Sequence, residues 1–376
     1  MDPRLTQLAD IIIGYSVALK PGEKILIDWA GHAAEDLVHA LVRRAAQAGG
    51  VPVWQQMEAS LVRQLVLNGS EEQLRDFGQV HRAHMAQFQA YVAVRGSDNI
   101  FEMNDIPPER RKWYTQHFTQ PVHMEQRLKH TKWCVLRYPN ASMAQLAETS
   151  TDAFKDFYFK ATLLDYKKFA AAMQPLKELM ARTDRIHIVA PGTDLKFSIK
   201  NIPVVPCVGD YNIPDGEVFT APVRDSINGT IQFNTPSPYM GSLFHNIQLT
   251  FRDGKIVEAD CEGDRDALTR ILDTDAGARY VGEFAVAFHP WIRTPMKDIL
   301  FDEKIAGSLH MALGNAYDMA FNGNRSGVHW DLVLIQRKEY GGGELFFDNR
   351  LIRKDGVFVA PELCGLNPEA WGAPPC

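Results

Sequence analysis

The chain has 376 residues, a length that predicts two domains, each able to bury its own core. Hydrophobic residues make up 45% of the chain and charged residues 23%, which argues against a disordered or fibrous protein. The net charge of −6 argues against nucleic acid or an anionic membrane surface as the main partner. A small neutral or cationic substrate fits this charge better.

The first residues and the cysteines predict a cytoplasmic protein. The opening "MDPRLTQLAD" lacks the basic region, apolar core and cleavage site of a secretory signal. No run of about 18 apolar residues predicts a membrane span. The cysteines are scattered and show no CxxC spacing, as expected for reduced thiols: Cys134, Cys207, Cys261, Cys364 and Cys376.

The first half of the chain alternates predicted strands and helices. Residues 8–19 and 33–50 have helical apolar spacing, and the segment 70–73, "SEEQ", has the form of a capping box that begins another helix. Strands are predicted at residues 23–29, 51–56, 90–96 and 133–138. This alternation predicts an α/β N-terminal domain with a mainly parallel sheet, over residues 1–183. The chain has neither GxGxxG nor GxxxxGK[ST], so we predict no nucleotide cofactor.

The second half is predicted to be mainly antiparallel β, with few helices. After the helical segment 167–183, strand-like segments occur at residues 185–192, 194–200, 229–234, 247–261 and 344–359. Asp253-Gly254 and Asp355-Gly356 separate alternating apolar residues, the strongest short-range signal of a hairpin. We therefore predict a second, α+β domain over residues 184–376.

The stretch "NRSGVHWD" places a histidine and an aspartate two residues apart before the apolar run "LVLIQ". In a strand, His329 and Asp331 project from one face while Trp330 packs behind. Such a pair has the form of two metal ligands. It is equally the form of one hydrogen-bonded pair at the end of an ordinary strand.

Three further candidates lie beside strand-like segments of the second half: Glu217, Glu283 and His310. Taken singly, they could be a solvated turn glutamate, an edge-strand charge and a core histidine. Together with His329 and Asp331 they form an oxygen and nitrogen donor set large enough for two divalent cations, with one carboxylate bridging. Two such cations support amide hydrolysis. HExxH and GxSxG, which would indicate other hydrolytic sites, are absent.

The sequence resembles the aminopeptidase T or leucyl aminopeptidase family of cocatalytic metallopeptidases, peptidase family M29, over nearly its whole length. The resemblance is carried by "YSVALKPGEKILID", "PGTDLKFSI", "DGEVFTAPVRDSINGTI" and, most specifically, "ILFDEKIAGSLHMALGNAY" followed by "NRSGVHWD". It implies that Glu217, Glu283, His310, His329 and Asp331 are metal ligands and that Tyr317 is catalytic. It also implies a metal-binding C-terminal domain and a homodimer.

The resemblance implies an aminopeptidase that binds two divalent ions per chain, Zn, Co, Mn or Mg, and releases N-terminal amino acids from peptides by attack of a metal-bridging water. We expect a glutamate, which we name as Glu217, to be the general base, and we expect Tyr317 to stabilise the oxyanion. On one unbroken helix, His310 and Tyr317 would lie about 10.5 Å apart along the axis. We therefore expect Gly314 and Asn315 to break the chain, so that Tyr317 follows a turn. Tyr317 could otherwise be a buried aromatic.

Two alternatives remain at this point. His310, His329 and Asp331 alone form the two-histidine, one-carboxylate set of mononuclear non-haem Fe(II) oxygenases, and a ring-cleaving dioxygenase is known on the same fold. The glutamate pair distinguishes the two readings, because a mononuclear iron site does not need Glu217 and Glu283. A non-enzymatic binding or assembly protein is the second alternative. We interpret His32 and His289 as structural residues.

Overall fold

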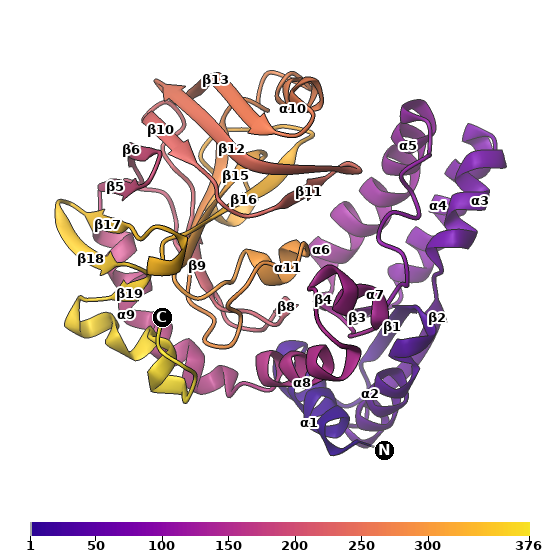
Figure 1. The fold of residues 1–376 in the computed structure, drawn as a ribbon. Helices are drawn as coiled ribbons and strands as arrows, with labels where there is room; N and C mark the ends of the chain where they lie inside the picture. Colours follow the sequence, from indigo (N-terminus) through magenta and orange to yellow (C-terminus); the bar gives the residue numbers. More distant parts are fainter. Residues whose placement is uncertain (1) are drawn as a thin grey trace. The chain divides into compact units, whose positions relative to one another are not determined.

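The computed structural model describes residues 2–376 and divides into two compact units (Figure 1). The first comprises the residues up to Leu163 together with Gly209–Pro214, and the second comprises Leu164–Val208 and Asp215–Cys376. The expected boundary between residues 183 and 184 falls after helix α9 (Tyr166–Arg182), whereas the compact units divide before it. The reason is packing: α9 contacts strands of the second unit, although the residue pattern changes only where those strands begin.

The first unit contains a parallel sheet with helices on both faces, as predicted. Its strands pair in the order β2-β1-β3-β4-β8. Their bounds are β1 (Lys24–Ala30), β2 (Val51–Gln56), β3 (Ala90–Arg95), β4 (Lys132–Arg137) and β8 (Asn212–Ile213). All residues of β1 after Lys24 are buried, Asp28 included, as expected for a strand covered on both faces.

The helices of the first unit follow the capping and periodicity signals of the sequence. Their bounds are α1 (Pro3–Ile11), the π-helical turn η1 (Ile12–Ser16), α2 (Glu35–Gln47), α3 (Ala59–Asn68), α4 (Glu71–Met85), α5 (Pro108–Tyr114), the π-helix η3 (Thr115–Arg127), α6 (Leu128–His130), α7 (Ala141–Leu146) and α8 (Thr151–Thr162). Ser70 and Gln73 form the predicted capping box of α4. Helix α2 packs on β1 and β2, while α4 and η3 bury Met85 and Phe118 against the other face (Figure 1).

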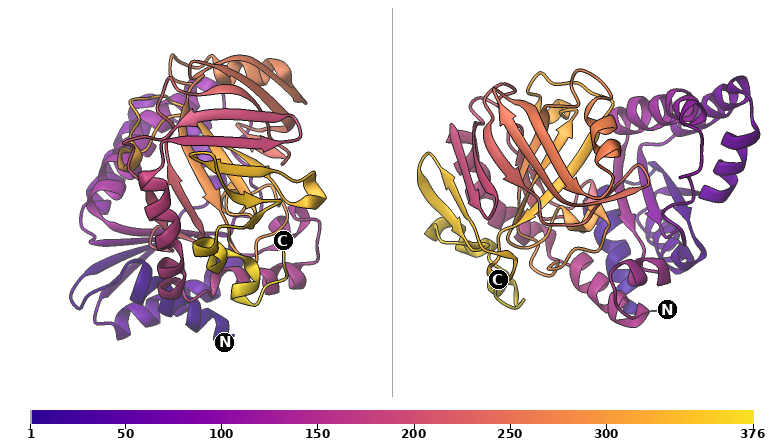
Figure 2. Two further views of the ribbon diagram at one scale, coloured as in Figure 1. Left: turned by 90° about the vertical axis from the view of Figure 1, so that its left-hand side faces the viewer. Right: turned by 45° about the horizontal axis from the view of Figure 1, so that its top comes forward.

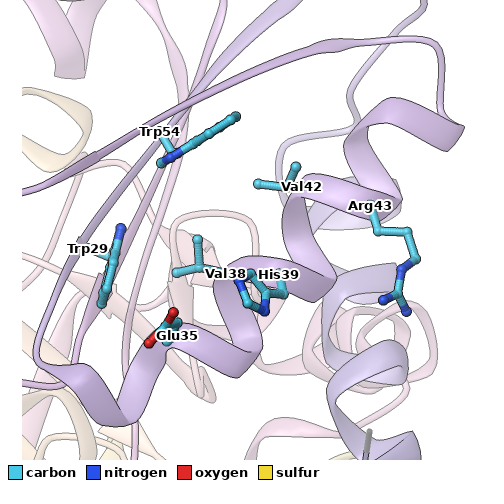
Figure 3. A pocket seen from close by; sticks show the side chains of 7 residues that line it. All are labelled: Trp29, Glu35, Val38, His39, Val42, Arg43 and Trp54. Carbon is cyan, nitrogen blue, oxygen red and sulfur yellow. The ribbon is translucent and has the colours of Figure 1, made fainter.

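A groove of about 470 Å³ lies between α2 and the edge strand β2 in the first unit (Figure 3). Two indole rings form one side of it, and one stripe of α2 forms the other. Its lining residues are Trp29, Glu35, Val38, His39, Val42, Arg43 and Trp54. None of the predicted ligands lines this groove, so its size does not bear on the predicted metal site.

The second unit is built mainly from antiparallel strands, as predicted (Figure 2). One sheet pairs in the order β11-β12-β10-β6-β5-β17-β18-β19, with β13 beside β12. Its strands are β5 (Arg185–Ala190), β6 (Thr193–Ser198), β10 (Asn228–Gln232), β11 (Ser237–Tyr239), β12 (Ser242–Arg252), β13 (Lys255–Glu262), β17 (Glu344–Phe347), β18 (Arg350–Lys354) and β19 (Val357–Phe358). Both predicted hairpins form, β12–β13 and β18–β19, with positive φ at both residues of each Asp-Gly pair.

A smaller antiparallel sheet of the second unit has the order β16-β15-β14-β9-β7. Its strands are β7 (Val205–Cys207), β9 (Glu217–Thr220), β14 (Val281–Ala287), β15 (Ser308–Gly314) and β16 (His329–Ile335). The remaining elements of this unit include α10 (Arg265–Leu272), α11 (Ile299–Asp302) and short 3-10 turns. Every residue of β14 and β15 is buried, so polar side chains on these two strands lie inside the unit. Within residues 2–376, no helix is long and apolar enough to cross a membrane.

Candidate metal centre

The predicted ligands lie on one face of the smaller sheet of the second unit. Glu217 begins β9, Glu283 lies in β14, His310 lies in β15, and His329 and Asp331 lie in β16. The strand register aligns them, because Glu283 pairs with Ala312 and Ala312 pairs with Asp331. Residues two apart along a strand share a face, so His310 and His329 join the same row of side chains.

Small residues surround the donors on this face. Ala285 is the partner of His310 across β14, and Ala287 is the partner of Glu217. Side chains opposite each other on antiparallel strands start about 5 Å apart at Cβ. Alanine at these positions therefore leaves room for the longer glutamate and histidine side chains, and the donors converge instead of being separated by bulky neighbours.

His310 is fully buried and turns its ring toward carboxylates. Its Nε2 lies 3.2 Å from Glu283 Oε1 and 3.9 Å from Asp331 Oδ1. Its Nδ1 lies 3.1 Å from the Glu303 carbonyl oxygen and 3.6 Å from Glu217 Oε2. A backbone carbonyl accepting from Nδ1 leaves Nε2 to hold a cation or a proton, which is the usual arrangement of a metal-binding histidine.

His329 repeats this arrangement at the beginning of β16. Its Nδ1 lies 2.9 Å from the Asn315 carbonyl oxygen. Its Nε2 lies 3.6 Å from Asp331 Oδ1 and 3.8 Å from Glu283 Oε2. The imidazole thus presents one nitrogen to two carboxylates without a hydrogen bond to either, so a cation between them would satisfy all three groups.

The donors form two close groups that share Glu283. Ligand atoms of Glu217, Glu283 and His310 lie within 4.8 Å of one another, and so do those of Glu283, His329 and Asp331. Glu217 and Glu283 are buried, so neither is a solvated turn or edge charge. Buried Glu217 Oε2 has no hydrogen-bond partner among the described residues. Carboxylate and imidazole donors arranged in this way fit two neighbouring divalent cations with Glu283 between them.

The pKa values of Glu217, His310 and His329 are raised, so these three groups hold protons more tightly than usual. Burial raises the pKa of Glu217 to about 8, although Lys304 and His310 act in the opposite direction. Burial disfavours the charged form of His310, but Glu217, Glu283 and Asp331 outweigh it and raise its pKa to about 10. Burial also opposes protonation of His329, and Asp331 with Glu283 raises its pKa above the ordinary value. Cations that bind here would have to displace these protons.

Two residues beside the donors were not singled out from the sequence, although they lie in the quoted segment "ILFDEKIAGSLHMALGNAY". A carboxylate oxygen of Glu303 lies within 4.8 Å of ligand atoms of His310 and Asp331. Lys304 is fully buried and pairs with the Glu303 carboxylate. Both lie in the turn between α11 and β15, where no strand periodicity marks a side chain as facing the donors. Their position within the most specific segment of the resemblance was the available signal.

Tyr317 lies beyond the end of β15, as the predicted break at Gly314 and Asn315 requires. Its side chain is exposed to 46%, so it is not a buried aromatic. The Tyr317 ring centroid lies 4.6 Å from that of His329. The tyrosine therefore stands at the exposed side of the donor cluster, in contact with one of the predicted ligands.

A pocket of about 100 Å³ adjoins the donors on the β16 side. His329 and Asp331 belong to its lining, together with Ile299 of α11 and the segment 235–239.

Of the histidines assigned a structural role, His289 is fully buried and its Nδ1 accepts from the Trp291 N–H at 3.3 Å, while His32 is exposed in a 3-10 turn of the first unit.

Comparison with protein families gives a match over most of the chain. The sequence profile of the family described as "Thermophilic metalloprotease (M29)" matches residues 1–346. Aminopeptidase T of Thermus thermophilus is 28% identical, over 86% of this chain and 87% of that protein. Aminopeptidase 2 of Geobacillus stearothermophilus is 24% identical, over 94% of this chain and 95% of that protein.

Solved structures of two proteins resemble the whole chain. AmpT from Thermus thermophilus has a TM-score of 0.79 at 25% identity and covers 95% of this chain and 99% of its own. The 2,5-dihydroxypyridine dioxygenase from Pseudomonas putida has a TM-score of 0.63 at 14% identity and covers 97% of this chain and 99% of its own. The second likeness concerns the fold alone.

Proposed function

Because the chain belongs to the M29 family of thermophilic metalloproteases, we propose that it is a metal-dependent aminopeptidase that releases N-terminal amino acids from peptides. The observation that carries this proposal is the pair of donor groups that share Glu283 on one buried sheet face. The names of the relatives, which are aminopeptidases, support the same reading.

In this proposal Glu217, Glu283 and His310 hold one divalent ion, and Glu283, His329 and Asp331 hold a second. The donor types accept Zn, Co, Mn or Mg. When bound, two such ions lower the pKa of a water molecule and polarise the scissile carbonyl. Glu283 would contribute to holding both ions, because its Oε1 faces His310 and its Oε2 faces His329.

The side chains of the protein supply proton transfer and charge stabilisation. We assign Glu217 as the general base, since it is buried beside the other donors and its Oε2 has no hydrogen-bond partner among the described residues. Tyr317 would donate a hydrogen bond from its hydroxyl to the developing oxyanion, a contact of a few kcal/mol. The Tyr317 ring lies against that of His329, with centroids 4.6 Å apart, which supports a place for this tyrosine beside the donors.

The alternative of a mononuclear iron oxygenase is not favoured. It would use His310, His329 and Asp331 and would leave Glu217 and Glu283 without a role. Both glutamates are buried and directed at the histidines, an arrangement that is costly for acids without a cation between them.

A metal-content measurement tests this function, paired with hydrolysis of leucine p-nitroanilide after addition of Co or Zn in turn. We expect about two ions per chain and metal-dependent release of nitroaniline. Glu217→Ala removes a ligand and the proposed base, so it should lose one ion and reduce kcat/KM by about a hundredfold or more. Glu258 is an exposed glutamate on β13, so Glu258→Ala is the matched control and should keep both the bound ions and the activity.

One equivalent of iron with no nitroaniline release would contradict the proposal. Oxygen uptake with dihydroxylated aromatic rings would then be the next measurement. Two bound ions without hydrolysis of any peptide or amino-acid anilide would instead favour a binding or assembly protein.

We further propose that the enzyme is cytoplasmic and that it is a homodimer, the latter because the family resemblance implies it. The five cysteines are free thiols, which suits a reducing compartment. Light scattering coupled to gel filtration measures the assembly directly, and a molar mass near the 42.3 kDa of one chain would contradict the dimer.

A further inference from the structure

Lys304 is fixed by its backbone beside the metal centre. Its N–H donates to the Phe301 carbonyl at 2.9 Å, and its own carbonyl accepts from the His289 N–H at 3.0 Å. The residue is fully buried, so its side chain cannot carry the ammonium to solvent. A lysine in this position needs carboxylates around it, because an unpaired buried charge is strongly unfavourable.

Three carboxylates surround the Lys304 ammonium. Nζ pairs with Glu303 Oε1 and lies 3.9 Å from both Asp215 Oδ1 and Glu217 Oε1. Asp215 and Glu217 are themselves buried. The ammonium therefore lies among three carboxylates, one of which, Glu217, is a predicted metal ligand.

The two oxygens of Glu217 face different partners. Oε1 faces Lys304, whereas Oε2 faces His310 Nδ1 at 3.6 Å and has no hydrogen-bond partner among residues 2–376. Lys304 thus lies near Oε1 of Glu217 and leaves Oε2 available to a cation. The ion pairs of Lys304 within the described chain do not include Glu283 or Asp331.

Lys304 supplies a positive charge to a region rich in carboxylates. Acids in ion pairs with Lys304 or with the two histidines are Asp215, Glu217, Glu283, Glu303 and Asp331. The positive charge of Lys304 lies on one side of the cluster, near Glu217, and therefore repels an ion held by Glu217 more strongly than an ion held by Asp331.

We propose that Lys304 is a built-in counter-cation that makes the two ion positions unequal. Its ammonium weakens cation binding at the Glu217–Glu283–His310 position and leaves the Glu283–His329–Asp331 position as the tighter one. Lys304 is a positioning residue in this account, since it acts through Glu217 and Glu303. The inference rests on the proposed two-ion centre, and it adds an order of filling in which the Glu217 position loads last.

Titration of the metal-stripped, full-length protein with Mn²⁺ in a calorimeter tests this order. The wild-type protein should show two steps of different dissociation constant. In Lys304→Met the new side chain has a similar length and no charge. The dissociation constant of the weaker step should therefore fall by about tenfold or more, and that of the stronger step should change by less than about threefold. Lys304→Arg restores the charge and should keep two unequal steps. Lys255→Met, an exposed lysine on β13, should behave as wild type.

Two unchanged steps in Lys304→Met, or a weaker second step, would overturn the inference and leave the two-ion centre standing. Absence of any Mn²⁺ binding by the wild-type protein would overturn the proposed function as well. If stripped Lys304→Met does not fold, the loaded variant is challenged with increasing chelator instead. It should then retain its second ion at chelator concentrations that remove this ion from wild type, and equal loss from the two proteins would contradict the proposal.

Discussion

At the scale of single residues, the candidate metal centre contains two groups, His310 and Glu217, that hold a proton more tightly in the folded protein than in the unfolded chain. His310 lies among Glu217, Glu283 and Asp331, and its pKa of about 10 reflects those carboxylates acting against burial. Glu217 has a pKa of about 8, chiefly because it is buried. Without metal, the cluster therefore uses protons as counter-charges, which divalent cations would replace on binding.

The first prediction concerns the pH dependence of the metal-free protein. His310 titrates near 10 in the folded protein and near 6.5 in the unfolded chain, so the folded state binds this proton more tightly. The stability that it contributes is complete below about pH 6.5 and is lost as the pH rises through about 10. Glu217, raised from 4.5 to about 8, acts with the same sign, and its contribution is lost as the pH rises through 8. Melting temperatures of the metal-stripped protein should therefore fall between pH 6.5 and 10.

Two comparisons isolate this effect from other titrating groups. Saturating metal displaces the protons, so the loaded protein should show a flatter profile over the same range. His310→Gln removes one of the two groups with these raised pKa values and should reduce the slope, most clearly between pH 8 and 10. An equal slope in metal-stripped wild type and His310→Gln would show that other residues govern the pH dependence.

At the scale of elements, the turn after β15 decides where two site residues lie. Gly314 ends the strand with φ of +92°, and a Cβ at this position would meet the Val328 carbonyl oxygen at 2.2 Å. The next residue, Asn315, accepts the hydrogen bond from His329 Nδ1, and Tyr317 follows two residues later. A glycine at 314 thus allows β15 and β16 to approach closely enough for His329 to be anchored.

The second prediction follows from this close approach. Gly314→Ala should lower the free energy of unfolding by about 1 to 3 kcal/mol and weaken metal binding, because the strands must separate where His329 is anchored. Gly323→Ala is the matched control, since its φ is also +92° but a Cβ there meets nothing within 4 Å. Urea denaturation and metal titration of both variants measure the difference. Equal losses of unfolding free energy and of metal affinity in the two variants would show that backbone strain alone, rather than the contact with Val328, accounts for these losses.

At the scale of the whole molecule, each compact unit has its own core, and buried polar contacts join the two sheets of the second unit. Arg353 of β18 is fully buried, and it donates to the Ala287 and Ser308 carbonyls at 3.2 and 2.8 Å and to Gln336 Oε1 at 2.9 Å. The larger sheet is thereby connected to β14 and β15, the strands that carry Glu283 and His310.

The third prediction tests this connection. Arg353→Met removes a charged donor of several buried hydrogen bonds and leaves carbonyls unpaired, so it should reduce the free energy of unfolding by about 3 kcal/mol. Arg350→Met on the same strand is the control, because Arg350 is exposed and its ion pair with Glu362 is screened by solvent; little change is expected. Urea denaturation measures both, and equal midpoints of the two variants would contradict a connecting role for Arg353.

The sequence by itself predicted the features that depend on neighbouring residues. Alternating strands and helices indicated the parallel sheet of the first unit, and the two Asp-Gly pairs indicated hairpins that form. His329 and Asp331 share a face because strand periodicity is local. The family was also recognisable from short segments, and the family match over residues 1–346 confirms it.

Tertiary structure decided the features that depend on contacts between distant segments. Helix α9 belongs to the second compact unit because of what it packs against, and Gly209–Pro214 returns to the first unit. Glu283 stands between two donor groups only because β14 lies between β9 and β15 in the sheet. Lys304 adjoins the donors although it lies in a turn without periodicity. Strand order and burial arise from packing across the chain, and no local residue pattern encodes them.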